Sequence, residues 1–143
     1  MSRHQARETA FKMIFQMDVG QNSLEIAERT LEEAVEEKAV SPKERSFVMG
    51  LAAGVEEKRE ELDAFIIEHA KGWTIDRINV IEKNIIRLAL YEIRYMDDIP
   101  YEVSVNEAIE LAKEYGDDDA YSFVNGILDN ARPPKKADAG EKK

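Results

Sequence analysis

Residues 80–95 read VIEKNIIRLALYEIRY, and they give the strongest indication of the fold. Wound as a helix, it presents apolar side chains around most of its circumference. Its polar strip is narrow and consists of Lys83, Asn84, Arg87 and Arg94. A helix with so little polar surface is packed on several sides by other elements. The stretch therefore predicts a central helix, from about residue 78 to residue 96, around which the other elements pack.

The remainder of the chain shows the same helical period, and its few Gly and Pro residues stand at joints between apolar segments. Two helix starts have the form of a capping box, Ser41 with Glu44 and Ser104 with Glu107. A break near Gly54 is expected in the third segment. The expected helices cover residues 3–17, 23–40, 42–70, 78–96, 104–115 and 117–128.

The sum is an all-α fold of about seven helices in two packed helical bundles. We expect one domain over residues 1–134, with halves 1–72 and 73–134 that meet near residues 72–78. Residues 135–143 are polar and basic, and we expect them to form a disordered tail.

The net charge, the absence of cysteine and the lengths of the apolar runs limit the possible classes of protein. The chain has 20 Lys and Arg against 30 Asp and Glu, a formal net charge of −10, so it repels nucleic acid at long range. Both ends nevertheless carry a surplus of cations. There is no cysteine, which removes disulfide scaffolds and thiolate metal sites. No apolar run is long enough to span a membrane, and we expect a cytoplasmic protein.

Motifs of catalysis are missing from the sequence. It contains no phosphate-binding glycine loop and no metal-binding H-E-x-x-H. The carboxylates at 117–119 lack the spacing of a calcium loop and suit the positive end of the last helix. The residues favour a binding protein over an enzyme, with no cofactor and no metal.

Three charged residues fall inside apolar helix faces, where a charge needs a partner. Arg3 and Arg7 lie in the apolar sector of the first helix, and Glu92 lies mid-way along the central helix. We expect Glu92 to be a buried, paired carboxylate. For Arg7 we consider a structural ion pair, with Asp119 as one candidate partner.

Four stretches, in order along the chain, resemble the NusB family of bacterial transcription antitermination factors. The first is residues 6–16, ARETAFKMIFQ. The second is residues 73–78, WTIDRI, leading into residues 82–92, EKNIIRLALYE. The third is Ile99-Pro100 followed by residues 105–113, VNEAIELAK, and the fourth is residues 123–129, FVNGILD.

The resemblance implies a non-catalytic, all-helical protein. Family members bind the boxA element of nascent RNA, notably in ribosomal RNA leaders, together with NusE, a ribosomal small-subunit protein. The complex helps RNA polymerase to resist termination. The alternative function that we keep open is a helical protein–protein adaptor or homodimer without specific RNA binding.

The resemblance also assigns site residues. The predicted RNA contacts are Arg3, His4, Arg7, Lys12, Asp119, Ser122 and Phe123. The predicted contacts with NusE are Asp76 and Glu82. Each has a structural alternative: Arg7 as an ion pair, Phe123 as core, Lys12 as a solvated side chain and Glu82 as a helix-dipole partner. A mostly negative protein can hold RNA if its N-terminal cations share one edge and a cationic partner contributes, so we expect such an edge.

Overall fold

The computed structural model describes residues 2–133, and within them it contains seven α-helices, two short 3-10 helices and no strand. This confirms the predicted all-α fold. The predicted tail at 135–143 lies outside the described residues. The α-helices are α1 (Arg3–Val19), α2 (Leu24–Glu36), α3 (Arg45–Glu57), α4 (Arg59–His69), α5 (Val80–Tyr95), α6 (Tyr101–Tyr115) and α7 (Ala120–Asp129). The 3-10 helices are η1 (Pro42–Glu44) and η2 (Ile75–Arg77).

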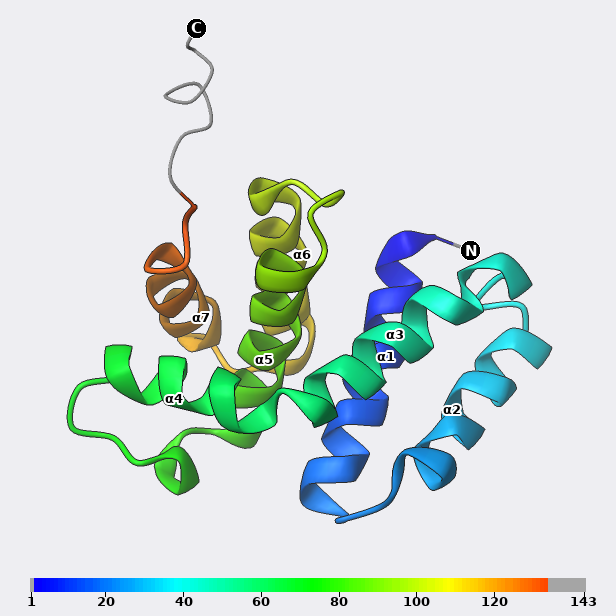
Figure 1. The fold of residues 1–143 in the computed structure, drawn as a ribbon, viewed down its shortest axis with the longest axis horizontal. Helices are drawn as coiled ribbons and strands as arrows, with labels where there is room; N and C mark the ends of the chain where they lie inside the picture. Colours follow the sequence, from blue (N-terminus) through cyan, green and yellow to red (C-terminus); the bar gives the residue numbers. More distant parts are fainter. Residues whose placement is uncertain (1, 134–143) are drawn as a thin grey trace, which may run out of the picture.

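The helices gather into two groups along the long axis of the molecule (Figure 1). Helices α1, α2 and α3 pack against one another at one end, and α5, α6 and α7 pack against one another toward the other. Both α1 and α3 also contact α5, and α4 packs on α5. Helix α5 is therefore the central element that its sequence predicts.

The middle of the polar strip of α5 points into the protein, whereas Arg94 at its end is exposed and pairs with Glu61. Asn84 and Arg87 are buried. The Arg87 guanidinium donates to both carboxylate oxygens of Asp63 on α4, at 2.7 and 2.8 Å, and to Asp18 at the end of α1, at 3.1 Å. Burial raises the pKa of Asp18, but the hydrogen bond from Asn84 and the charges of Arg87, Lys83 and Arg59 outweigh it and lower that pKa overall. The strip thus joins α1, α4 and α5 through charge-assisted hydrogen bonds.

A second ionic contact joins α1 to α5. Arg7 Nε and Nη2 donate to the two carboxylate oxygens of Glu92 at 2.7 and 3.0 Å, and both side chains are almost fully buried. The Ser104 hydroxyl on α6 donates to the same carboxylate at 2.7 Å. The predicted buried, paired Glu92 is confirmed. Asp119 as the partner of Arg7 is wrong, because the partner is Glu92.

Two predicted helix starts differ from the structure. Helix α6 begins at Tyr101, directly after Pro100, so Ser104 is an interior residue and not a cap. Its hydroxyl satisfies Glu92, and Glu107 is used by His4. Ser41 does cap η1, accepting from the backbone N–H of Lys43, but Glu44 bonds to Arg3 in place of closing a capping box.

Two predicted ends within the first half also shift. The expected break of this segment into two helices is confirmed, but it lies at Lys58, between α3 and α4, and not near Gly54. Gly54 lies inside α3, where a Cβ would overlap the Tyr91 ring of α5, so this glycine allows close helix packing. The second helix ends at Glu36 and not near Val40, and Lys38 then takes a positive φ of 65°.

Candidate nucleic-acid interface

The predicted RNA contact at the start of α1 is partly occupied by the protein itself. Ser2 caps α1 by accepting from the backbone N–H of Gln5, which fixes the first turn. Arg3 Nε donates to Glu44 at 2.9 Å, and its guanidinium lies 3.8 Å from the centre of the Phe47 ring. About half of the Arg3 side chain stays exposed, so it is stacked and paired at the surface.

His4 faces a different helix. Its Nδ1 lies 2.7 Å from Glu107 and its Nε2 lies 3.2 Å from Glu114, both on α6. The hydrogen bond to Glu107 raises the pKa of His4, burial opposes it, and Glu114 adds to the rise. The protonated ring can donate from both nitrogens at once, so His4 works as a cationic link between α1 and α6.

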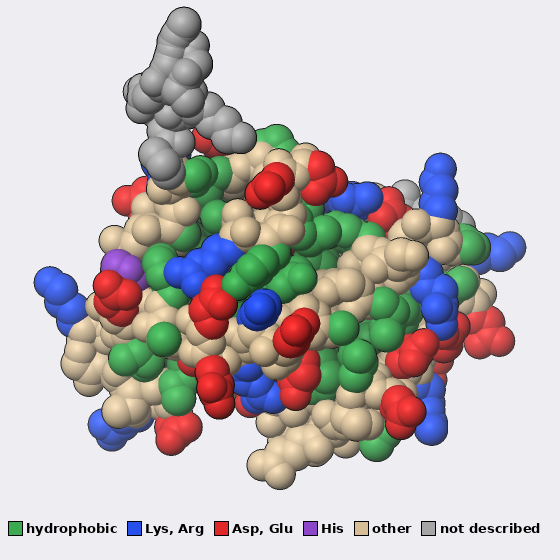
Figure 2. Space-filling view, viewed as in Figure 1, with side chains coloured by type: hydrophobic (Ala, Val, Ile, Leu, Met, Phe, Trp, Pro, Cys, Tyr) green, Lys and Arg blue, Asp and Glu red, His purple; other side chains and the backbone are tan. Residues whose placement is uncertain are grey.

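The expected cationic edge is not found as one free surface. Arg7 is 3% exposed and bound to Glu92, and Arg3 and His4 point to different helices. On the face in Figure 2, Lys and Arg side chains alternate with Asp and Glu and do not merge into one zone. Arg3 and His4 are adjacent in the helix, so their side chains point about 100° apart, and Arg7 is held inside the protein by Glu92. Lys12 is exposed and makes no ion pair with residues 2–133.

An apolar cavity of about 270 Å³ lies beside Lys12, where α1 meets the start of α5 and the end of α6. Its walls are Phe11, Lys12, Phe15, Gln16, Ile81 and Tyr115. Tyr115 packs on Phe11 with ring centres 5.2 Å apart, and its hydroxyl bonds to Glu8. Burial and that hydrogen bond raise the pKa of Tyr115, so the phenol stays protonated and donates. Ile81 lines this cavity, and the next residue in the chain, Glu82, lines a second cavity.

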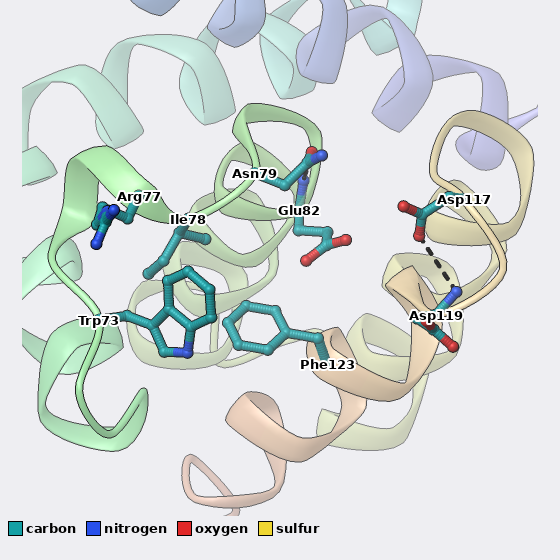
Figure 3. Close-up of a pocket in the computed structure, with 8 residues that line it drawn as sticks. All are labelled: Trp73, Arg77, Ile78, Asn79, Glu82, Asp117, Asp119 and Phe123. Atoms are coloured by element: carbon teal, nitrogen blue, oxygen red, sulfur yellow. Dashed lines mark hydrogen bonds between the residues drawn. The ribbon is translucent and has the colours of Figure 1, made fainter.

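The second cavity, of about 260 Å³, lies where α5, α7 and the segment before η2 come together. Figure 3 shows Trp73 and Phe123 side by side on one part of its wall, and Glu82, Asp117 and Asp119 on another. Asp117 accepts from the backbone N–H of Asp119 at 3.2 Å, which fixes the turn before α7. Burial raises the pKa of Glu82, and the charges of Asp117 and Asp119 add to the rise. None of these three carboxylates forms an ion pair within the part of the chain that the structure describes.

A third, more open cavity of about 400 Å³ adjoins the second, because Trp73 and Phe123 line both. Its other walls are His69, Ala70, Lys71, Ser122, Gly126 and Ile127. Phe123 is half-buried: it packs against the core and also reaches both cavities. The structural and the binding interpretation of Phe123 are therefore compatible.

The predicted site residues fall into two places. Arg3, His4, Arg7 and Lys12 lie along α1, whereas Glu82, Asp119, Ser122 and Phe123 gather around the two cavities next to α7. Asp76 is exposed on η2 and does not line these cavities. The apolar cavity beside Lys12 lies between the two places.

Sequence reasoning placed Trp73 in the second stretch of the family resemblance and at the joint between halves, but did not include it among the candidate site residues. Its indole is 51% exposed, which is unusual for so large an apolar side chain. The available signal was a tryptophan between Gly72 and polar neighbours, outside any apolar period. No helix within residues 2–133 has the length and apolarity to cross a membrane, and no group of three or more His, Cys, Asp or Glu there could hold a metal ion.

Comparison with known proteins gives a consistent result over nearly the whole chain. The model of the NusB family matches residues 4–133. The transcription antitermination protein NusB of Bacillus subtilis is 44% identical over 132 residues, which cover 92% of this chain and 95% of the relative. The protein of the same name from Oceanobacillus iheyensis is 45% identical over 130 residues, covering 90% of this chain and 96% of the relative.

Solved structures agree with these relatives. NusB of T. maritima is 35% identical and superimposes with a TM-score of 0.82, covering 92% of this chain and 90% of that one. A chain from the crystal structure of the antitermination factors NusB and NusE in complex with dsRNA is 28% identical, with a TM-score of 0.77. It covers 92% of this chain and 97% of that one.

Proposed function

The chain belongs to the NusB family, and from that premise we propose that it is a non-catalytic transcription antitermination factor that binds boxA-type single-stranded RNA together with NusE. The setting would be ribosomal RNA transcription, within the antitermination complex of RNA polymerase. The observation that carries the proposal is the match at 41–45% identity, over nine-tenths of the chain, to relatives named as antitermination proteins.

We assign the RNA to the surface that runs from the start of α1 to the cavities beside α7. Arg3, His4 and Lys12 would contact phosphates, and Ser122 and Phe123 would contact a nucleotide. Arg7 acts by holding α1 on α5, because its guanidinium is buried and both of its hydrogen bonds go to Glu92. Asp119, which is exposed, can accept from a base amino group.

We assign NusE to the acidic side of the same surface. Glu82 lines the second cavity and lacks an ion-pair partner among residues 2–133, and Asp76 is exposed on the adjoining η2. A basic ribosomal protein would supply the cations that these carboxylates lack. It would also offset the net charge of −10, which opposes RNA binding by this chain alone.

The direct test is a titration of fluorescently labelled boxA RNA with this protein, with NusE, and with both. We expect both proteins together to bind at least tenfold more tightly than either alone, and to prefer boxA over a scrambled sequence. Raising the salt concentration should weaken binding, because phosphate neutralisation releases counterions. A base-paired boxA duplex tests whether the RNA must be single-stranded. Equal binding of boxA and scrambled RNA in the presence of NusE would reject the proposal.

The adaptor or homodimer function has one observation in its favour. Three of the four predicted cations on α1 already have carboxylate partners within the protein. If the protein binds NusE or itself with micromolar affinity and RNA contributes nothing, this second function is the correct one.

A further inference from the structure

We propose that Trp73 and Phe123 together form a stacking site for one unpaired RNA base, with Lys71 as the contact to an adjoining phosphate. The inference rests on the proposed RNA-binding function and deepens it. Neither Trp73 nor Lys71 is among the residues that the family resemblance assigns. The site is the open surface cavity of about 400 Å³ that both rings line, which leaves room for a base to approach from solvent.

The backbone holds the indole outward. Helix α4 ends at His69, and the chain then turns through Gly72, whose φ of +79° is strained for any residue with a Cβ. The backbone N–H of Trp73 donates to the carbonyl of buried Ala70 at 3.0 Å, which closes this turn. The indole is therefore displayed from a fixed turn and is not buried in the core. Exposing it has a cost in hydrophobic free energy that a stacked base would recover.

The second ring comes from a separate element. Phe123 stands one turn into α7, and part of its ring is anchored in the core. Figure 3 shows it next to Trp73, and both rings line both cavities. Both rings are held by anchored segments of the chain. The protein therefore loses little conformational freedom when a base stacks on them. Base–aromatic stacking tolerates any sequence because every base has a π-face.

The charges around the rings differ between the two sides, and this selects the orientation of the ligand. Lys71 and the polar side chains of His69 and Ser122 line the open cavity, whereas the other cavity is lined by one cation, Arg77, and by the three carboxylates Glu82, Asp117 and Asp119, so its lining is net negative. A phosphate is attracted to the first side and repelled by the second. His69 is held by its own packing on Phe65, with ring centres 4.4 Å apart. An RNA strand therefore fits with its backbone beside Lys71 and its base over the two rings.

Trp73 is the single tryptophan of the chain, which permits a direct measurement. Incorporation of 5-fluorotryptophan gives one fluorine resonance, and unlabelled NusE contributes none. We expect that resonance to shift when boxA RNA is added to the complex with NusE. In parallel, Trp73→Ala should weaken RNA binding about tenfold, Trp73→Phe should retain most of the affinity, and Lys71→Ala should weaken it about threefold and lower the salt dependence.

Matched controls come from the opposite end of the molecule. Ile26 on α2 is also 51% exposed, so Ile26→Ala removes a comparably exposed apolar side chain. Arg29 is exposed on the same helix, so Arg29→Ala removes the same charge as Lys71→Ala. Both controls should bind RNA like the parent protein. Urea unfolding of every variant separates loss of binding from loss of folding.

Three outcomes overturn the inference. In the first, RNA binds tightly but the fluorine resonance does not move and Trp73→Ala binds like the parent, which leaves the proposed function intact. In the second, the resonance shifts with NusE alone and does not change further on adding RNA, which makes Trp73 a protein contact. In the third, RNA does not bind the parent complex at all, and the proposed function then fails first.

Discussion

The start of α1 and the start of α7 differ in whether their charged side chains have ion-pair partners within the protein. At the start of α1, Arg3, His4 and Arg7 each have a carboxylate partner on another element. Around the start of α7, Asp117, Asp119 and the nearby Glu82 of α5 have no ion-pair partner within residues 2–133. We call the α1 end of the proposed interface closed, because its charges are paired within the protein, and the α7 end open, because its carboxylates are not.

The difference separates stability from recognition. Closed ion pairs fix α1 against α3, α5 and α6, but they leave the cations less available to RNA. At the other end, burial raises the pKa of Glu82 and repulsion from Asp117 and Asp119 raises it further, so a cationic partner would relieve this repulsion. Removing a carboxylate should therefore destabilise the protein at the α1 end and should not do so at the α7 end.

The largest effect is expected at the buried pair. Glu92→Gln removes the hydrogen-bonded counter-charge of buried Arg7 and leaves only Glu107, 4.0 Å from Nη1, so the free energy of unfolding should fall by about 3 kcal/mol. Urea denaturation measures it. The double variant Arg7→Met, Glu92→Met removes both charges and should recover part of the loss. If the single variant unfolds at the parent urea concentration, the pair is not a stabilising contact.

The next largest effect is expected at the open end. Glu82→Gln should reduce affinity for NusE about tenfold, because it removes a carboxylate that a basic partner would neutralise. The free energy of unfolding should stay equal or rise slightly, because the repulsion from Asp117 and Asp119 is relieved. Calorimetric titration and urea denaturation measure the two quantities. Glu25→Gln, at an exposed site on α2, is the matched control and should change neither. A large loss of stability in Glu82→Gln would show that this carboxylate is structural.

A smaller effect, on RNA affinity, is expected when a carboxylate partner of His4 is removed at the start of α1. Glu114→Gln frees one side of His4, and RNA binding in the presence of NusE should tighten about two- to threefold. Glu110 lies on the same helix and is exposed, so Glu110→Gln changes the net charge equally and controls for it. Equal gains in both variants would mean that only the overall charge matters and that the contact to His4 does not restrain RNA binding.

The smallest effect is a pH dependence of stability that arises at His4. Its pKa is raised in the folded protein, mainly by Glu107, so the protonated ring stabilises the fold. That contribution is fully present below the unfolded value near 6.5 and is lost as pH rises through the higher folded value. The difference in unfolding free energy between the parent and His4→Gln should therefore shrink from pH 5.5 to pH 9. A constant difference would show that His4 is neutral throughout this range.

Helical periodicity was sufficient to identify the elements and the central role of α5. Residues 80–95 carry apolar side chains around most of the helix, and this predicts that the helix is buried. The prediction needs only the hydrophobicity of each side chain and its position on the helix, and both follow from the sequence. Boundaries were less certain. Ser104 resembled a cap, but Pro100 had already fixed the start of α6, and the serine hydroxyl was used inside the protein.

The amino-acid pattern alone predicts a helical protein with α5 at its centre, and it predicts that Arg7 and Glu92 lie on apolar faces and need partners. The folded structure is needed to see that these two residues pair with each other, across 85 positions, that His4 links α1 to α6, and that Trp73 lies beside Phe123. Periodicity specifies only which face of a helix turns inward. Which other helix meets that face depends on packing among all of them, and this cannot be read from any one segment.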